Sequence, residues 1–139
     1  MNRVVVVLMM AVGLVWGCGQ DKYADVVEVN DQFITVTQDY VDGLNKAQSG
    51  KDVAKAMNKY ADEFKKLAPK MNDLNTKYPD LAKMKDLPEK IKISQEKAGQ
   101  MGAAFASSFM KSIQYMGDPE VVAAQERMAG IMQSVQPKN

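Results

Sequence analysis

The sequence lacks histidine entirely and has a single cysteine, Cys18, among its 139 residues. Without histidine, the isolated chain cannot build an imidazole general base, an imidazole ligand to haem or a histidine-containing metal site. A lone cysteine also cannot form a disulfide bond within one chain. These absences exclude the many hydrolases, haem proteins and di-iron carboxylate bundles that depend on such groups.

An excess of charge of either sign is also missing. The 18 lysine and arginine residues are balanced by 17 aspartate and glutamate residues, and removal of residues 1–17, which contain Arg3 and no acidic residue, leaves 17 against 17 (18 − 1 = 17). Nucleic-acid-binding domains usually show a basic excess or a basic stripe with aromatic residues. We therefore predict no nucleic-acid partner.

Residues 1–17 form an apolar leader that begins with one positive charge, Arg3, and continues through the apolar run 4–16. This pattern is that of a secretory signal rather than a membrane-spanning helix. Val15-Trp16-Gly17-Cys18 follows, and it resembles the lipobox of bacterial lipoproteins, with an apolar residue three positions before the cysteine and glycine directly before it.

The resemblance to bacterial lipoproteins implies that the signal is cleaved before Cys18. Cys18 would then carry thioether-linked diacylglycerol and usually an acylated amine, which together anchor a protein stably in a membrane. Because Gly19 rather than aspartate follows, the resemblance implies the outer membrane, with the protein facing the periplasm. We expect a removed signal at 1–17, a lipidated tether at 18–21 and one domain at 22–136.

Apolar residues spaced alternately by three and four predict helices over about 22–47, 50–77 and 87–116, and a short one after Pro119. Ser49-Gly-Lys-Asp52 resembles a capping box that starts the second helix, and Pro69 is expected to kink that helix without ending it. Asp86 is the predicted N-cap of the third. We predict an all-α fold, an up-down antiparallel bundle of three long helices plus a short C-terminal fourth.

Charge supports pairing of the first two helices. Residues 22–47 contain two basic and five acidic residues, and residues 50–77 contain seven basic and four acidic residues. Asn30 and Thr37 interrupt the apolar stripe of the first helix. Such polar residues usually fix register or pair across a bundle, although they could also line a ligand site.

The most unusual stretch is Ala98–Met110, which has no charged residue although a quarter of the chain is charged. An uncharged run of this length is more often a buried helix than a membrane span, so we predict that it lies at the centre of the bundle. Two glycines three residues apart suggest a close helix crossing, with a seam for a ligand or a partner as the alternative. The residues of this predicted seam are Gly99, Gly102, Ala103, Phe105, Ala106 and Phe109.

These patterns indicate a protein that binds other molecules and does not catalyse a reaction. No acidic residue lies on the predicted inner stripes, and the methionines are spread singly along them, so we predict no metal, no cofactor and no enzymatic activity. The predicted function is that of a non-catalytic, lipid-anchored envelope protein that contacts proteins or other envelope components. The alternative is a periplasmic binding module that holds a small apolar ligand or a lipid tail between helices. We expect a monomer or a weak homo-oligomer.

Overall fold

The computed structural model describes residues 22–134, and in this part of the chain every regular element is helical. Residues 22–134 form four α-helices and two short 3-10 helices, which confirms the prediction of an all-helical fold. Their bounds are α1 (Ala24–Lys46), α2 (Gly50–Lys77), η1 (Leu81–Lys83), α3 (Glu89–Ser112), η2 (Ile113–Tyr115) and α4 (Pro119–Ser134).

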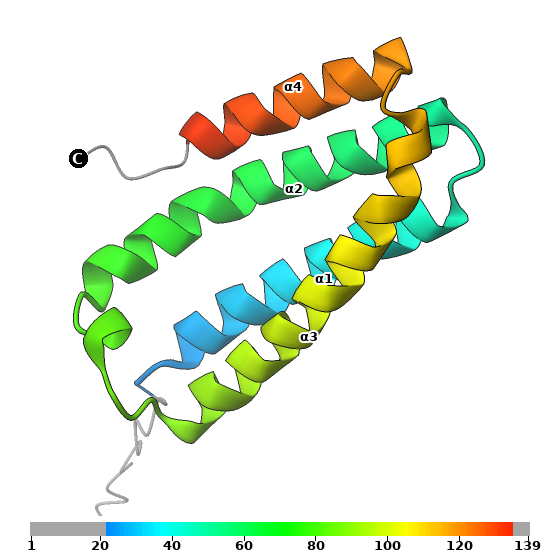
Figure 1. Cartoon of the computed structure of the whole chain (residues 1–139). Helices are drawn as coiled ribbons and strands as arrows, with labels where there is room; N and C mark the ends of the chain where they lie inside the picture. Colours follow the sequence, from blue (N-terminus) through cyan, green and yellow to red (C-terminus); the bar gives the residue numbers. More distant parts are fainter. Residues whose placement is uncertain (1–21, 135–139) are drawn as a thin grey trace, which may run out of the picture.

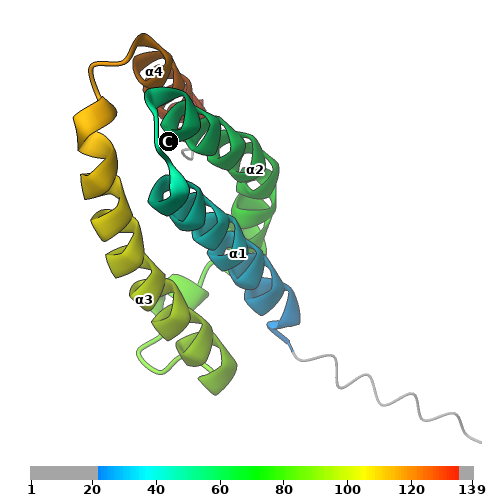
Figure 2. The same ribbon diagram turned by 90° about the vertical axis from the view of Figure 1, so that its right-hand side faces the viewer.

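The four helices pack as a row rather than as a closed square. α1 and α2 lie side by side, α3 packs mainly against α1, and α4 packs mainly against α2 (Figures 1 and 2). Each outer helix therefore has one main neighbour. Within residues 22–134 no helix is both long enough and apolar enough to span a membrane.

The start of α2 follows the predicted capping box. The Oγ atom of Ser49 accepts a hydrogen bond from the backbone N–H of Asp52 at 3.2 Å, and the carboxylate of Asp52 accepts one from the N–H of Gln48 at 3.1 Å. α2 then continues through Pro69 as one helix, as predicted. α3 begins differently from the prediction, because its N-cap position is Pro88 rather than Asp86 and has no side-chain cap.

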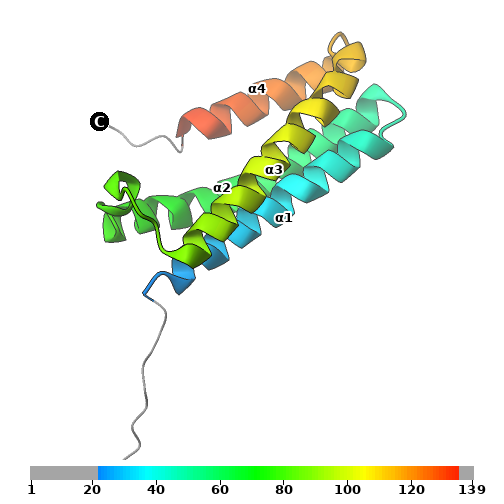
Figure 3. The same cartoon turned by 60° about the horizontal axis from the view of Figure 1, so that its bottom comes forward.

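The densest part of the core lies at the end of the bundle where α1 ends and α2 begins. Tyr40, Val53, Met57 and Val121 are the largest fully buried side chains there, and they come from α1, α2 and α4. At the opposite end, α1 begins, α2 ends and α3 begins (Figures 1 and 3). Packing there is looser, and apolar side chains such as Val26 and Leu74 are only half-buried.

A close helix crossing exists, but it lies at Gly43 and not at the predicted glycines of α3. A Cβ atom built on Gly43 would lie 2.9 Å from the Cβ of Ala56, so α1 and α2 touch there almost backbone to backbone. Gly99 and Gly102 are exposed, and an added Cβ at either one would meet no atom within 4 Å. The predicted tight crossing at these two glycines is therefore wrong for the described chain.

The prediction that Ala98–Met110 is the centre of the bundle is also wrong. Within this run only Ser108 is buried, and Met110 is 66% exposed. The run lacks charge, but its glycine, alanine, serine and glutamine side chains carry little apolar area, so their exposure costs little. In addition, α3 has one main neighbouring helix, which covers only one stripe of its surface.

The polar interruptions of α1 make the contacts expected of structural residues. The Nδ2 group of Asn30 donates a hydrogen bond to the Oγ atom of Ser94 at 2.5 Å, which links α1 to α3. The hydroxyl of Thr37 donates to the carbonyl of Phe33 within α1 at 2.9 Å. Asn30 therefore pairs across the bundle and fixes the position of α3 along α1.

Ion pairs connect the oppositely charged helices along their exposed edges. Lys59 of α2 pairs with Asp39 of α1 at 2.8 Å, and Lys77 pairs with Asp25 at 2.6 Å. The side chains of Lys59 and Asp39 are 63% and 52% exposed, so solvent screens this pair and it contributes little to stability. Such pairs support the predicted pairing of the first two helices but do not provide its main stability.

The three glycines give a stability test in which the chemical change is the same each time. Gly43→Ala should lower the free energy of unfolding by about 1–3 kcal/mol, because the new methyl group overlaps Ala56. Gly99→Ala and Gly102→Ala should each raise it by about 0.5–1 kcal/mol, because alanine favours the helix and meets open space. Urea unfolding followed by circular dichroism measures all three. Equal effects at Gly43 and Gly102 would contradict the assigned crossing.

Candidate binding sites

The structure splits the predicted seam of α3 into two faces. Phe105 points into the bundle, with its ring centroid 5.2 Å from that of Tyr40 and 6.2 Å from that of Tyr60. Phe109 stacks on Phe105 at 6.5 Å, and both pack against the main core. The other four predicted residues, Gly99, Gly102, Ala103 and Ala106, are exposed. The seam is therefore not one continuous ligand site.

The exposed half of the seam belongs to a longer uncharged surface, which we call the outer face of α3. It runs from α3 into η2, and all its members are exposed: Gly99, Gly102, Ala103, Ala106, Met110 and Ile113. Met110 and Ile113 are 66% and 46% exposed, which is high for large apolar side chains. The two glycines each cost the helix about 1 kcal/mol relative to alanine and are not required by any contact in the described chain.

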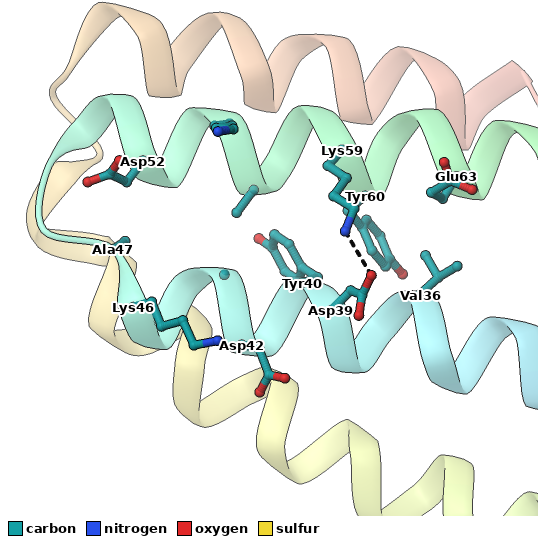
Figure 4. A pocket seen from close by; sticks show the side chains of 13 residues that line it. Val36, Asp39, Tyr40, Asp42, Lys46, Ala47, Asp52, Lys59, Tyr60 and Glu63 are labelled. Atoms are coloured by element: carbon teal, nitrogen blue, oxygen red, sulfur yellow. Dashed lines mark hydrogen bonds and ion pairs between the residues drawn. The ribbon is translucent and has the colours of Figure 1, made fainter.

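A groove follows the line between α1 and α2 on one side of the bundle (Figure 4). Its volume is about 540 Å³, and charged side chains from both helices line it: Asp39, Asp42, Lys46, Asp52, Lys55, Lys59 and Glu63. The Lys59–Asp39 ion pair spans it. Hydrogen bonding to Asp39 raises the pKa of Lys59. We interpret this α1–α2 groove as a solvated charged surface.

Beneath this groove lies a buried phenol that lacks a partner. Tyr40 is 2% exposed, and its hydroxyl makes no hydrogen bond within the described residues. Burial, together with the neighbouring Tyr60, raises the pKa of Tyr40 to about 12. Burial also raises the pKa of Tyr60, although a hydrogen bond with Thr37 acts in the opposite direction. Both rings therefore stay neutral at physiological pH and act as packing groups.

A second hollow, the N-terminal pocket, lies at the opposite end of the bundle and has a volume of about 440 Å³. α1, the end of α2, η1 and the start of α3 enclose it. None of the residues that line it is charged: Val26, Val29, Asn30, Phe33, Met71, Leu74, Asn75, Tyr78, Pro79, Leu81, Ile91 and Gln95. Its walls are apolar, and amide and phenol groups provide its polar atoms, a composition typical of small-molecule sites.

The rim of the N-terminal pocket holds the first described residue of the chain in place. The hydroxyl of Tyr78 donates a hydrogen bond to the carbonyl of Lys22 at 2.7 Å and contacts the carboxylate of Asp25 at 3.0 Å. Lys77 donates to the same carboxylate at 2.6 Å, and this bond is the main cause that lowers the pKa of Asp25. The start of α1 is thus tied to the end of α2 beside the pocket.

Pocket size and position follow from the unequal lengths of the helices. α4 has 16 residues and α2 has 28, about 24 Å and 42 Å of helix. Arg127 of α4 hydrogen-bonds Asn58 and pairs with Asp62, which places α4 along the first part of α2. The last turns of α2 therefore extend beyond α4, and the pocket lies among the remaining elements.

Sequence reasoning missed the N-terminal pocket. The absence of charge that distinguishes it appears only when uncharged residues of α1, α2, η1 and α3, far apart in the chain, come together. Cys18, the predicted lipidation site, lies outside the described residues. Within residues 22–134, no three histidine, cysteine, aspartate or glutamate side chains gather as a metal site would require. No family model, no curated protein and no solved structure matches this chain.

The buried phenol predicts a loss of stability at alkaline pH. Above pH 10 an unfolded tyrosine loses its proton while Tyr40 keeps it up to about pH 12, so the folded state binds more protons and stability falls as pH rises. The slope from this group is about 1.4 kcal/mol per pH unit. Tyr40→Phe should remove that slope and, because the hydroxyl has no partner, raise neutral-pH stability by up to about 1 kcal/mol.

Urea unfolding at a series of pH values, with tyrosinate absorbance as a second reading, measures both effects. A Tyr40→Phe profile parallel to that of the wild type above pH 10 would show that this phenol titrates normally.

Proposed function

We propose that this chain is a lipid-anchored envelope protein without catalytic activity. Its role is to bind a helical segment of another envelope protein. In this proposal the mature chain is a single up-down helical bundle, tied through Cys18 to the outer membrane and facing the periplasm. The anchor is supported by the lipobox-like Val15-Trp16-Gly17-Cys18, in which the single cysteine of the chain stands at the position that would be lipidated.

The observation that carries the binding role is the outer face of α3. This surface is uncharged over about four turns, in a protein where the α1–α2 groove is lined by charges from both helices. It keeps two glycines that lower helix stability and have no role in packing the described chain. A close approach by another backbone would give these glycines a physical purpose.

A helix is the partner element that fits this surface best. From Gly99 to Ile113 the outer face rises about 21 Å, the length of a short amphipathic helix. Small residues at its middle let a second helix come close, and the exposed side chains of Met110 and Ile113 provide apolar contacts at one end. Recognition of this kind uses apolar anchors spaced by three and four along the partner helix.

A second function, the binding of a small apolar ligand between helices, is supported by a different observation. The N-terminal pocket is uncharged and apolar, and its volume of about 440 Å³ lies within the range of about 300–1,000 Å³ for small-molecule sites. This ligand site uses Ile91 and Gln95 at the start of α3 and shares no residue with the outer face, which begins at Gly99, so one function does not exclude the other.

The anchor predicts how the protein fractionates. Wild-type protein expressed in a bacterial host with its own signal should appear in the membrane fraction and resist extraction with salt, because acyl chains rather than charges hold it. Cys18→Ala should abolish lipid labelling by a radioactive fatty acid and block cleavage before residue 18. Identical labelling and identical size of the two proteins would contradict the anchor.

The outer face of α3 predicts a position-specific crosslinking pattern. A photo-crosslinking amino acid at Ala103 or Met110 in intact cells should give a discrete adduct, and the same group at Lys55, in the charged α1–α2 groove, should not. Ala106→Arg should reduce the adduct formed from Ala103 about tenfold, since it places a charge in an apolar contact.

Circular dichroism of the Ala106→Arg protein controls for folding, because Ala106 is exposed and its replacement should leave the helices intact. A heterologous adduct from the outer face supports the proposal. An adduct between two copies of this chain would make the surface a homodimer interface instead, and equal adducts from Ala103 and Lys55 would contradict a specific site.

A further inference from the structure

The N-terminal pocket differs chemically from the rest of the surface around it. Its lining contains no lysine, arginine, aspartate or glutamate, whereas the hollows along α1 and α2 include Asp39, Lys59 and Lys70. Apolar area exposed to water costs about 25 cal/mol per Å². A hollow with walls from Phe33, Leu74 and Ile91 therefore gains free energy when an apolar group fills it.

The size and lining of the pocket restrict the kind of apolar ligand that it can bind. Helix walls on three sides and η1 on the fourth leave a hollow of about 440 Å³ that remains open to solvent. The polar side chains of the lining are neutral amides and one phenol: Asn30, Asn75, Gln95 and Tyr78. No charged side chain lines the pocket, so it cannot compensate the charge of a ligand group buried inside it.

The pocket lies close to the point where the chain enters α1, and therefore close to the proposed lipid on Cys18. Tyr78 lines the pocket and also holds the carbonyl of Lys22 at 2.7 Å, so the chain enters α1 at the pocket rim. Cys18 stands four residues before Lys22, and four extended residues span at most about 14 Å. The proposed lipid on Cys18 would therefore start within about 14 Å of the pocket rim, close enough for an acyl chain to reach the uncharged hollow.

We propose that the N-terminal pocket binds one long acyl chain, with its polar head left at the mouth beside Asn75 and Gln95. The inference deepens the ligand-binding candidate above. The affinity of the pocket for acyl chains does not depend on the anchor. The anchor affects only which acyl chain is bound, because the proposed lipid on Cys18 and the surrounding membrane can each supply one. A short tether gives the attached chain a high effective concentration at the pocket.

The test uses a long-chain fatty acid that carries a diazirine near its methyl end. Two forms of the mature chain are compared: lipidated protein in lipid nanodiscs, and protein with Cys18→Ala made without residues 1–17. After irradiation, mass spectrometry locates the labelled residues. We expect the unlipidated form to be labelled at Phe33, Leu74 or Ile91, with labelling displaced by unlabelled long-chain acid and not by acetate.

Matched substitutions test whether labelling comes from the pocket. Met71→Trp fills the pocket, whereas Met110→Trp makes the same change on the exposed outer face of α3. We expect pocket labelling to fall about tenfold for Met71→Trp and to be unchanged for Met110→Trp. Asn75→Trp, at an exposed position on the rim, blocks the mouth with little risk to folding and should act like Met71→Trp.

Comparison of the two forms then identifies the source of the acyl chain. Pocket labelling in both forms supports the proposal with the membrane as the source. Labelling lost in the lipidated form supports it with the chain on Cys18 as the occupant. Absence of pocket labelling in the unlipidated form, or labelling that Met71→Trp and Asn75→Trp leave unchanged, overturns the proposal. The mass of the N-terminal peptide reports lipidation independently, so a missing anchor is not mistaken for an empty pocket.

Discussion

The close crossing of α1 and α2 at Gly43 and Ala56 joins the two central helices of the row, on which the outer helices pack. Only the methyl group of Ala56 separates the two backbones there. Tyr40 and Tyr60 therefore pack against each other across the α1–α2 interface, with their ring centroids 4.8 Å apart and their planes tilted by 37°. Phe105 of α3 packs on these two rings. α4 is added from the opposite side of α2, where Val121 and Met57 are fully buried. α3 thus uses an aromatic surface to which both α1 and α2 contribute, whereas α4 packs mainly on α2.

In a row of helices, the outer helices bury less of their surface than they would in a closed bundle. In a closed bundle each helix contacts two neighbours and buries a wide apolar stripe. Here α3 has one main neighbour, so its inner stripe is covered and its second uncharged surface remains in water. Ile91, Phe105 and Phe109 and the Asn30–Ser94 hydrogen bond hold α3 against the bundle.

The two ends of the row differ because the helices differ in length. Where α4 covers α2, buried side chains from three helices form the main core. Beyond the end of α4, half-buried apolar residues of α1 and α2, together with the buried Ile91 of α3, enclose the N-terminal pocket. The tie from Tyr78 to Lys22 and Asp25 closes this end by polar contacts instead of by a packed core. Both proposed binding surfaces, the outer face of α3 and this pocket, therefore result from incomplete coverage of apolar helix surface.

The sequence by itself determined the elements of this fold. Local patterns predicted the helices: apolar residues spaced by three and four marked each one, and the Ser49–Asp52 cap marked the start of α2. The same spacing continues on both sides of Pro69, which predicted that α2 does not end there. Residue counts alone gave the complementary charge of α1 and α2. These local patterns could not determine which apolar stripe meets which. An uncharged run such as Ala98–Met110 has the same composition whether it is buried or exposed, and a glycine costs the same backbone freedom in either place. Only the tertiary structure decided that Gly43 is the crossing point, that Gly99 and Gly102 face solvent, and that uncharged residues from four elements enclose one pocket, because those outcomes depend on helix lengths and contacts between residues far apart in the chain.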